Sequence, residues 1–217
     1  KVNPDGSVTP MLAESWSSSP DMKTFVFKLR KGVRFENGQP FNANTVKFSF
    51  DRAGGEKSTN KDKRFFSEIG TVVLDEHTVG VNSTLSNPDL PFMLGQSTAC
   101  IVEPKSAETN ATAPVGTGPY KLSAWQRGAS CTLVKSPTYR DPNLAKTEKF
   151  VFRFMSDTAA QTAALLSNDI DIFPRAGTRS VSQFKGNARF QVLEVGTRGK
   201  VILTINNRKK PLDDVRV

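Results

Sequence analysis

Histidine and cysteine are scarce in this sequence. Its 217 residues contain one histidine, His77, and two cysteines, Cys100 and Cys131. Because these residue types supply most general bases and most ligands of transition metals, few sites of either kind can be built from them. Two cysteines are too few for a disulfide framework, although a single disulfide between them is possible in an oxidising compartment. The alternation around Cys131 favours a buried free thiol.

Long hydrophobic runs are missing as well. No stretch reaches the roughly 18 consecutive apolar residues of a membrane-spanning helix, and the N-terminus lacks the apolar segment of a signal peptide. We therefore expect any export signal or lipid anchor to lie outside these residues. The hydrophobic content of 37% is nevertheless sufficient for a packed core. The composition indicates a globular chain with one large domain or two small ones.

The charge is strongly positive, +9 at pH 7. Such a charge is found in proteins that bind nucleic acids or anionic surfaces, but here the basic residues are scattered among acidic ones. The densest clusters, at residues 28–31, 61–64 and 208–210, lack the interleaved aromatic residues of a platform for single-stranded nucleic acid. We predict solvated surface charge and no nucleic-acid partner, and keep a basic nucleic-acid binder as an alternative.

Period-two alternation marks the first clear strand. Residues 24–30 place Phe25, Phe27 and Leu29 on one face. Asn42 then precedes a segment in which Val46, Ser49, Phe50 and Ala53 recur at i, i+3, i+4 and i+7. This spacing predicts a capped helix that ends at a pair of glycines.

A strand, a turn and a second strand are predicted next, at residues 71–74, 75–77 and 78–81. Prolines interrupt residues 86–106, so we expect only a short helix at 91–94.

The second half is predicted to be an α/β region. A glycine-rich turn at residues 115–120 comes first, and a helix runs from Asp157 to Asn168. The strands expected here are residues 120–126, 131–135, 149–154, 169–173 and 201–206. The strand–helix–strand run around the helix is long enough for a crossover unit. Asp213 resembles the cap of a further helix, and since the chain stops within its first turn we expect a fragment.

Three patterns with catalytic potential have simpler interpretations. His77 is the only base available to a serine or cysteine hydrolase, but it falls in a predicted turn without a Gly-x-Ser-x-Gly motif. Asp169 and Asp171 would lie about 7 Å apart on one strand face, as paired carboxylates can, yet a solvated edge is preferred. The glycines of residues 116–118 lack the lysine and third glycine of phosphate-binding loops. We predict no catalytic residue, no metal and no cofactor.

Several ordered segments resemble the family 5 extracellular solute-binding proteins, which include oligopeptide-, dipeptide- and nickel-binding proteins of ABC importers. The segments that carry the resemblance are residues 12–16, 24–30, 32–41, 42–52, 116–125, 136–139, 168–172, 205–207 and 211–217. They include the runs Ala-Glu-Ser-Trp, Gly-Val-Arg-Phe, Asn-Gly-Gln-Pro-Phe and Gly-Thr-Gly-Pro-Tyr. The sequence departs from the family pattern at Ser136, Arg140, Asn168 and Leu212, where asparagine, tryptophan, glycine and phenylalanine are usual.

The resemblance implies a fold and a division into domains. The fold is α/β and periplasmic-binding-protein-like (type II, cluster C) with a mixed β-sheet, of which this chain is the N-terminal portion and lacks most of the ligand-closing domain. Residues 1–14 start the first domain and 15–115 form a smaller second domain. Residues 116–199 return to the first domain, and 200–217 are the crossing strand and the start of the closing domain.

The resemblance also implies a function. The expected role is that of an extracytoplasmic substrate-binding component of an ABC importer, without enzymatic activity, that binds a peptide or similar small solute between its domains and delivers it to a permease. The site residues carried over are Thr197, Ile202, Thr204 and Asn206; for Ile202 a place in the core is an equal alternative. The expected location is the periplasm, or the outer face of the cytoplasmic membrane through a lipid anchor. With half of the cleft missing, this chain alone should bind its solute weakly or not at all.

Overall fold

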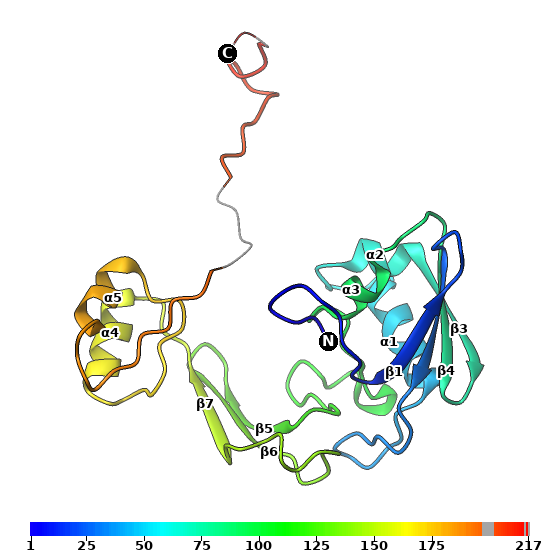
Figure 1. The fold of residues 1–217 in the computed structure, drawn as a ribbon, viewed down its shortest axis with the longest axis horizontal. Coiled ribbons are helices and arrows are strands. Elements are labelled where there is room, and N and C mark those ends of the chain that lie inside the picture. Colours follow the sequence, from blue (N-terminus) through cyan, green and yellow to red (C-terminus); the bar gives the residue numbers. More distant parts are fainter. Residues whose placement is uncertain (197–201, 215, 217) are drawn as a thin grey trace. The chain divides into compact units, whose positions relative to one another are not determined.

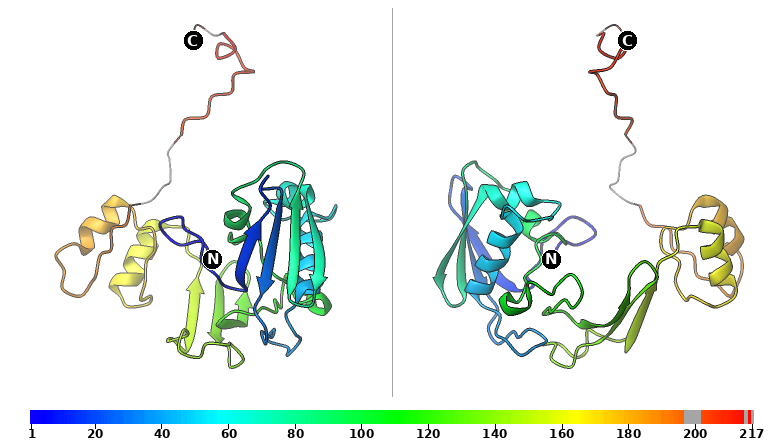
Figure 2. Two further views of the ribbon diagram at one scale, coloured as in Figure 1. Left: turned by 45° about the vertical axis from the view of Figure 1, so that its right-hand side comes forward. Right: turned by 180° about the vertical axis from the view of Figure 1, so that it is seen from behind.

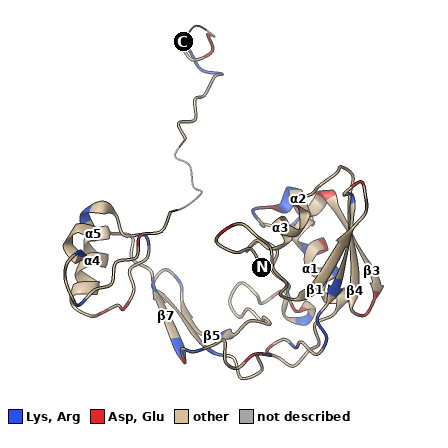
Figure 3. Cartoon of the chain, viewed as in Figure 1, with Lys and Arg blue, Asp and Glu red and all other residues tan. Residues whose placement is uncertain are grey.

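The computed structural model describes residues 1–196, 202–214 and 216. These form two compact units, Lys1–Phe154 and Met155–Val217 (Figure 1). Lysine and arginine are interspersed with aspartate and glutamate along the elements of both units (Figure 3). None of the described helices is long and apolar enough to span a membrane.

The first unit begins with a four-stranded antiparallel sheet, in the order β1-β2-β4-β3. Its strands are β1 (Ala13–Ser18), β2 (Thr24–Leu29), β3 (Ile69–Asp75) and β4 (Thr78–Ser83). The predicted alternation of β2 is confirmed, because Phe25, Phe27 and Leu29 are all buried. They belong to a core cluster that also contains Val79 and Val81 of β4.

Helix α1 (Ala43–Gly54) lies across one face of this sheet (Figures 1 and 2). The predicted cap is confirmed: the Asn42 side chain accepts a hydrogen bond from the Thr45 amide, and the Thr45 hydroxyl accepts one from the Asn42 amide. Gly54 ends the helix where α2 (Lys63–Glu68) approaches it. A Cβ atom on Gly54 would lie 2.6 Å from the backbone of Phe66, so only glycine fits without a shift.

Short elements and a second sheet complete the first unit. The predicted short helix is confirmed as α3 (Leu90–Leu94), and a 3₁₀ turn, η1, covers Pro104–Ser106. The strands predicted at residues 120–126, 131–135 and 149–154 are confirmed as β5 (Tyr120–Gln126), β6 (Ser130–Lys135) and β7 (Lys149–Arg153). They form an antiparallel sheet in that order.

The register of the second sheet gathers apolar side chains on one face. Leu122 lies opposite Leu133, which lies opposite Phe150, and Cys131 lies between Trp125 and Phe152. Since successive residues of a strand point to opposite faces, these side chains share one side of the sheet.

The second unit has two helices, α4 (Thr158–Leu166) and α5 (Thr178–Phe184), of which α5 was not predicted. The Asp157 side chain caps α4 by accepting a hydrogen bond from the Ala160 amide. Asn168, where the predicted helix ends, adopts a left-handed conformation with φ of 61°, which asparagine tolerates. The buried hydroxyls of Thr162 and Ser180 lie 3.0 Å apart and join the two helices.

The predicted strand at residues 169–173 is wrong, and so is the crossover unit that includes it. The amides of Asp169 and Ile170 both donate to the carbonyl of Ala164, which closes the end of α4. These donors are therefore used locally instead of in a sheet, and Ile172 is left 73% exposed. Asp169 and Asp171 consequently share no strand face.

The predicted strand at residues 201–206 is also not formed in its described part, residues 202–206. Its pattern is apolar, but Ile202, Leu203 and Ile205 are exposed and no described strand pairs with them. Asp213 itself lies in a turn, after the one closed by the Leu212 amide and the Lys209 carbonyl, and the two described residues that follow it, 214 and 216, are not helical.

Both cysteines are free. Cys131 is half-buried in β6 instead of fully buried, and Cys100 is exposed, with its thiol donating to the carbonyl of Ser97 at 3.0 Å.

Candidate functional site

The sequence-predicted solute contacts fall in the second unit. Thr197 lies outside the described residues, as does the expected domain crossing near Gly199. Ile202, Thr204 and Asn206 lie in one exposed segment that has neither helix nor strand conformation. The structure therefore brings these three side chains together only as near neighbours in the chain.

Exposure makes this segment available for contact. The side chain of Ile202 is 79% exposed and that of Leu203 is 86% exposed. The Asn206 side chain accepts a hydrogen bond from the Arg208 amide at 3.1 Å, which fixes the turn after the segment. Residues 202–206, Ile-Leu-Thr-Ile-Asn, carry both apolar and polar side chains, so the segment can offer an apolar surface and hydroxyl or amide groups to a solute.

A second group with binding chemistry, Glu36, lies in the first unit. It follows Phe35, a fully buried residue that fixes a tight loop, and precedes Asn37 and the left-handed Gly38. The Glu36 amide donates to the carbonyl of Gly116 at 3.0 Å. The loop of residues 33–41 is thus joined to the glycine-rich turn before β5.

Glu36 borders a recess of about 280 Å³ at the apolar face of the β5–β6–β7 sheet. The other side chains that line it are mostly apolar, among them Tyr120, Leu122 and Trp125. Burial raises the pKa of the Glu36 carboxyl above its usual range, although a hydrogen bond from the Gly116 backbone and the positive charge of Lys121 oppose the rise. Such a carboxyl can accept hydrogen bonds from a cationic group and loses its charge more readily than a solvated one.

Sequence analysis missed Glu36. A sequence signal for Glu36 does exist. The carboxylate follows the alternating apolar residues Val33 and Phe35 and immediately precedes the Asn37-Gly38 turn. A short loop closed on a buried phenylalanine leaves such a side chain little room to reach solvent.

Glu103 is the most buried carboxylate of the described part, with 2% of its surface exposed. Burial alone raises its pKa, but hydrogen bonds from the Lys105 amide, the Asn37 side chain and the Ser106 amide outweigh burial and hold the pKa below its usual value. Its acceptor oxygens are thus occupied by the protein itself. Glu103 fastens η1 to the loop of residues 33–41.

A cluster of metal-binding side chains is not seen in the described ranges. No three His, Cys, Asp or Glu side chains of residues 1–196, 202–214 and 216 gather into a metal site. His77 lies in the turn between β3 and β4, as predicted, with its Nε2 atom 4.0 Å from a Glu76 carboxylate oxygen. Its Nδ1 atom is buried and has no hydrogen-bond partner within that same part of the chain.

Comparison with protein families decides the relationship. Residues 7–217 match the model of the bacterial extracellular solute-binding proteins, family 5 Middle. The chain belongs to this family. Its fold class is that of the periplasmic binding proteins, as the sequence predicts, and its relatives are solute-binding transport proteins and not enzymes.

Individual family members resemble the chain at modest identity. The dipeptide-binding protein of Escherichia coli K12 is 28% identical, over 97% of this chain and 44% of its own length. A solved structure of the periplasmic binding protein AgaA from A. tumefaciens R10 with agropinic acid is 29% identical, with a TM-score of 0.78 over 84% of this chain and 38% of that one. The structure of MoaA from the same organism, with mannopinic acid, is 27% identical. Its TM-score is 0.80, and the match covers 100% of this chain and 45% of MoaA. This family 5 chain thus spans less than half the length of each.

Proposed function

We propose that the protein is the extracytoplasmic substrate-binding component of an ABC importer. It captures a peptide or similar small solute in a cleft between domains and passes it to a membrane permease. The observation that carries this proposal is the match to the solute-binding family over residues 7–217, nearly the whole chain. Closure around a bound solute that stabilises one conformation is how such a component signals occupancy to its partner.

The proposed domains follow the family pattern. Residues 1–14 begin the first domain, 15–115 form the smaller second domain and 116–199 return to the first. Residues 200–217 cross toward the closing domain. The first unit, Lys1–Phe154, is compact, which supports the proposal that the first two segments and the part of the third up to β7 fold together.

The proposed solute contacts are Thr197, Ile202, Thr204 and Asn206. Support for the last three comes from their exposure and from the presence of both apolar and polar side chains in the segment. Ile202 is 79% exposed, so covering it with a solute or with another domain would remove apolar surface from water and stabilise the bound state.

The solute class follows from what relatives bind. A dipeptide-binding protein and a protein bound to agropinic acid are both similar to this chain at 28–29% identity. We infer a small, polar, peptide-like solute. The protein catalyses no reaction, binds no nucleic acid and meets the membrane only through its permease or an anchor, in the periplasm or on the outer face of the cytoplasmic membrane.

Calorimetric titration of the full-length product of the gene tests this function. Dipeptides, longer peptides, opine acids, nickel chelates and sugars are titrated in turn. One class should bind with one-to-one stoichiometry and be recovered unchanged. Chemical conversion of the bound solute, or a shift of labelled nucleic acid at about 0.15 M salt, contradicts the proposal.

A further inference from the structure

The tip of the loop at residues 33–41 carries the one Asn-Gly pair of the sequence, Asn37 and Gly38. The Gly38 amide donates to the Phe35 carbonyl at 2.9 Å, and Gly38 has φ of 80°, a left-handed conformation that favours glycine at this turn. A Cβ atom on Gly38 would meet nothing within 4 Å beyond its chain neighbours, and Asn37 is exposed. Water therefore reaches both residues.

An asparagine followed by glycine is prone to deamidation, because glycine has no side chain to hinder attack by its amide nitrogen. The Gly38 nitrogen gives up its proton and attacks Cγ of Asn37. The Cγ–Nδ2 bond breaks, and Nδ2 takes up that proton and leaves as ammonia. The cyclic imide that remains is opened by one water molecule to aspartate or isoaspartate. Water is the only co-reactant.

The fold holds both reacting groups of this pair. Nδ2 of Asn37 donates to Oε2 of Glu103 at 3.0 Å, and its Oδ1 accepts a hydrogen bond from the Gln39 amide at 3.2 Å. Attack requires the Asn37 side chain to rotate until Cγ meets the Gly38 nitrogen, and these two bonds oppose the rotation. The proton that Gly38 must lose is itself donated to the Phe35 carbonyl.

Glu103 also opposes the reaction through its charge. Burial raises its pKa, but hydrogen bonds from Asn37 and from the backbone of η1 outweigh burial and hold the pKa below its usual value. The carboxyl is therefore ionised near neutral pH and has no proton to give to the leaving nitrogen. Its negative charge, in contact with the Asn37 amide, also disfavours the oxyanion that forms as Cγ is attacked.

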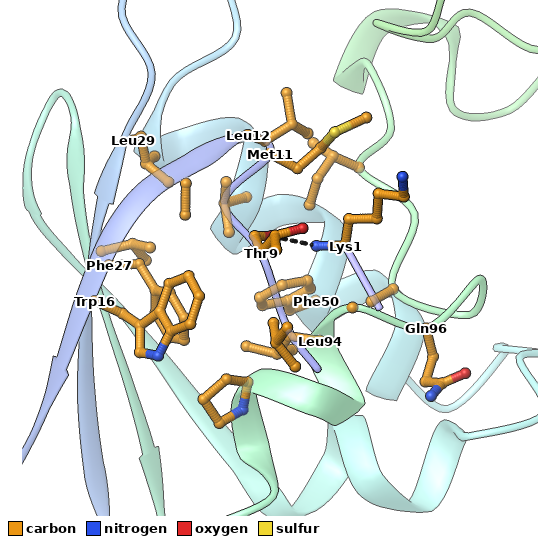
Figure 4. Close-up of a pocket in the computed structure, with 18 of the residues that line it drawn as sticks. Lys1, Thr9, Met11, Leu12, Trp16, Phe27, Leu29, Phe50, Leu94 and Gln96 are labelled. Carbon is orange, nitrogen blue, oxygen red and sulfur yellow. Dashed lines mark hydrogen bonds between the residues drawn. The ribbon is translucent and has the colours of Figure 1, made fainter. Parts of the chain in front are cut away.

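The loop is anchored in the core of the first unit at both of its ends. Val33, Phe35 and Phe41 are each no more than 5% exposed and belong to the core cluster. Figure 4 shows two other members of that cluster, Phe27 of β2 and Phe50 of α1. The Phe41 amide donates to the Val33 carbonyl at 3.0 Å and closes the base of the loop. The tip can therefore open locally while the core stays packed.

Deamidation turns the donor of the Glu103 contact into a second acceptor. Aspartate at position 37 places a carboxylate oxygen where Nδ2 lies, 3.0 Å from Oε2 of Glu103. Two ionised carboxylates at that separation repel each other, so one must take up a proton or move away. Isoaspartate adds a methylene group to the backbone of the turn as well. Either product releases the loop from η1.

We propose that Asn37 is a site of spontaneous deamidation that its contact with Glu103 keeps closed in the folded first unit. The site reacts in chains whose loop at residues 33–41 has opened, and its product prevents the loop from closing as before. The modification is thus a lasting record of loop opening. The site lies in the first unit alone, apart from the proposed solute contacts.

Peptide mass spectrometry measures the reaction. Trypsin releases residues 35–47 as one peptide, in which Asn42 and Asn44 are internal references for Asn37. The 217-residue chain is incubated in mildly alkaline buffer with and without guanidinium chloride. We expect Asn37 to be the fastest of the three asparagines in the unfolded chain and to react about tenfold or more slower in the folded one. Equal rates at Asn37 in the two conditions contradict the proposal.

Glu103→Gln tests the contact itself. Because it removes the charge and weakens the hold on Asn37, the folded variant should deamidate at Asn37 roughly fivefold or more faster than the unmodified chain. Glu148→Gln makes the same change at a side chain that is 83% exposed and should leave the rate unchanged. An unchanged rate in folded Glu103→Gln, or an equal increase in both variants, overturns the role of Glu103.

Asn37→Asp reproduces one product of the reaction and keeps the test decisive should Glu103→Gln fail to fold. Repulsion from Glu103 should lower its melting temperature near neutral pH by roughly 2–4 °C. The loss should shrink in acid, where one of the two carboxyls takes up a proton. A variant as stable as the unmodified chain near neutral pH would show that the product does not release the loop, and would overturn the proposal.

Discussion

The two units of the chain use similar apolar patterns with different results. In the first unit, strands β1 to β4 pair with one another and thirteen buried residues form one core cluster. In the described part of the second unit only Ala164 and Phe184 are buried hydrophobic residues, and the apolar segment at 202–206 is exposed. An apolar pattern in the sequence thus indicates which side chains favour burial. Whether a strand forms depends on a neighbouring strand with which its backbone can form hydrogen bonds.

The largest expected loss of stability comes from a substitution in the core of the first unit. Phe35→Ala removes a fully buried ring and should lower the free energy of unfolding by about 3–5 kcal/mol. Urea denaturation followed by circular dichroism measures the loss. The control is Phe152→Ala at a position that is 51% exposed, which should lower stability by only about 1 kcal/mol. Similar losses at the two sites would mean that the core is not where the structure has it.

Glu103→Gln comes next, because it replaces a buried acceptor of three hydrogen bonds by an amide that cannot accept them all. The expected loss at pH 7 is about 1–3 kcal/mol. Since the folded-state pKa of Glu103 is lowered, its contribution is present above the unfolded-state pKa and disappears as the pH falls through the folded-state pKa. Unfolding curves of both proteins should therefore converge in acid. A difference that persists at low pH would rule out the ionised carboxylate as the cause.

Helix caps sharpen the comparison between the units. Asn42→Ala removes the capping box of α1, which lies on the core, and should lower the global free energy of unfolding by about 1 kcal/mol. Asp157→Ala removes the corresponding cap of α4. Because α4 contributes few buried residues, we expect faster amide exchange within residues 158–166 without a shift of the main transition. Equal shifts of the main transition would show that the two units unfold as one.

The smallest stability effect is expected at Glu36, with the opposite sign to Glu103. Its folded-state pKa is raised, so the ionised carboxylate destabilises the fold above that pKa and has no effect below the unfolded-state pKa. Glu36→Gln should stabilise the protein near pH 7 by less than about 1 kcal/mol, after solvent screening of a partly exposed group. The gain should vanish in acid. Thermal melts at several pH values measure it, and a loss of stability near pH 7 would contradict the burial of this carboxyl.

Much of the first unit could be predicted from sequence. Short-range signals were sufficient for β2, for the Asn42 cap and for the turn at residues 75–77, because each depends on neighbours within a few positions. The same signals failed at residues 169–173, where the end of α4 takes the amides that a strand would need. Helix α5 has no side-chain cap to signal it in the sequence, and its buried Ser180 contacts Thr162 of α4, which is 18 residues away.

The candidate site was predictable only in part. Family motifs pointed to Ile202, Thr204 and Asn206, and they remain predictions. Glu36 and Glu103 escaped because their importance comes from contacts with Gly116 and Asn37, which are distant in sequence. The apolar residues Val33 and Phe35 before Glu36 are a weak local signal, whereas no local pattern reports Glu103, whose carboxylate is held by the distant Asn37.

Titration calorimetry on the full-length product of the gene, with two variants of the exposed segment, tests the central claim most directly. The unmodified protein should bind one class of peptide-like solute one to one and leave it chemically unchanged. Ile202→Ser should weaken that solute by about tenfold, or 1.4 kcal/mol, with no change in melting temperature, while Leu203→Ser at the alternate position should not. Binding that is absent for every solute class, or equal in the two variants, would contradict the proposed solute-binding function or its site.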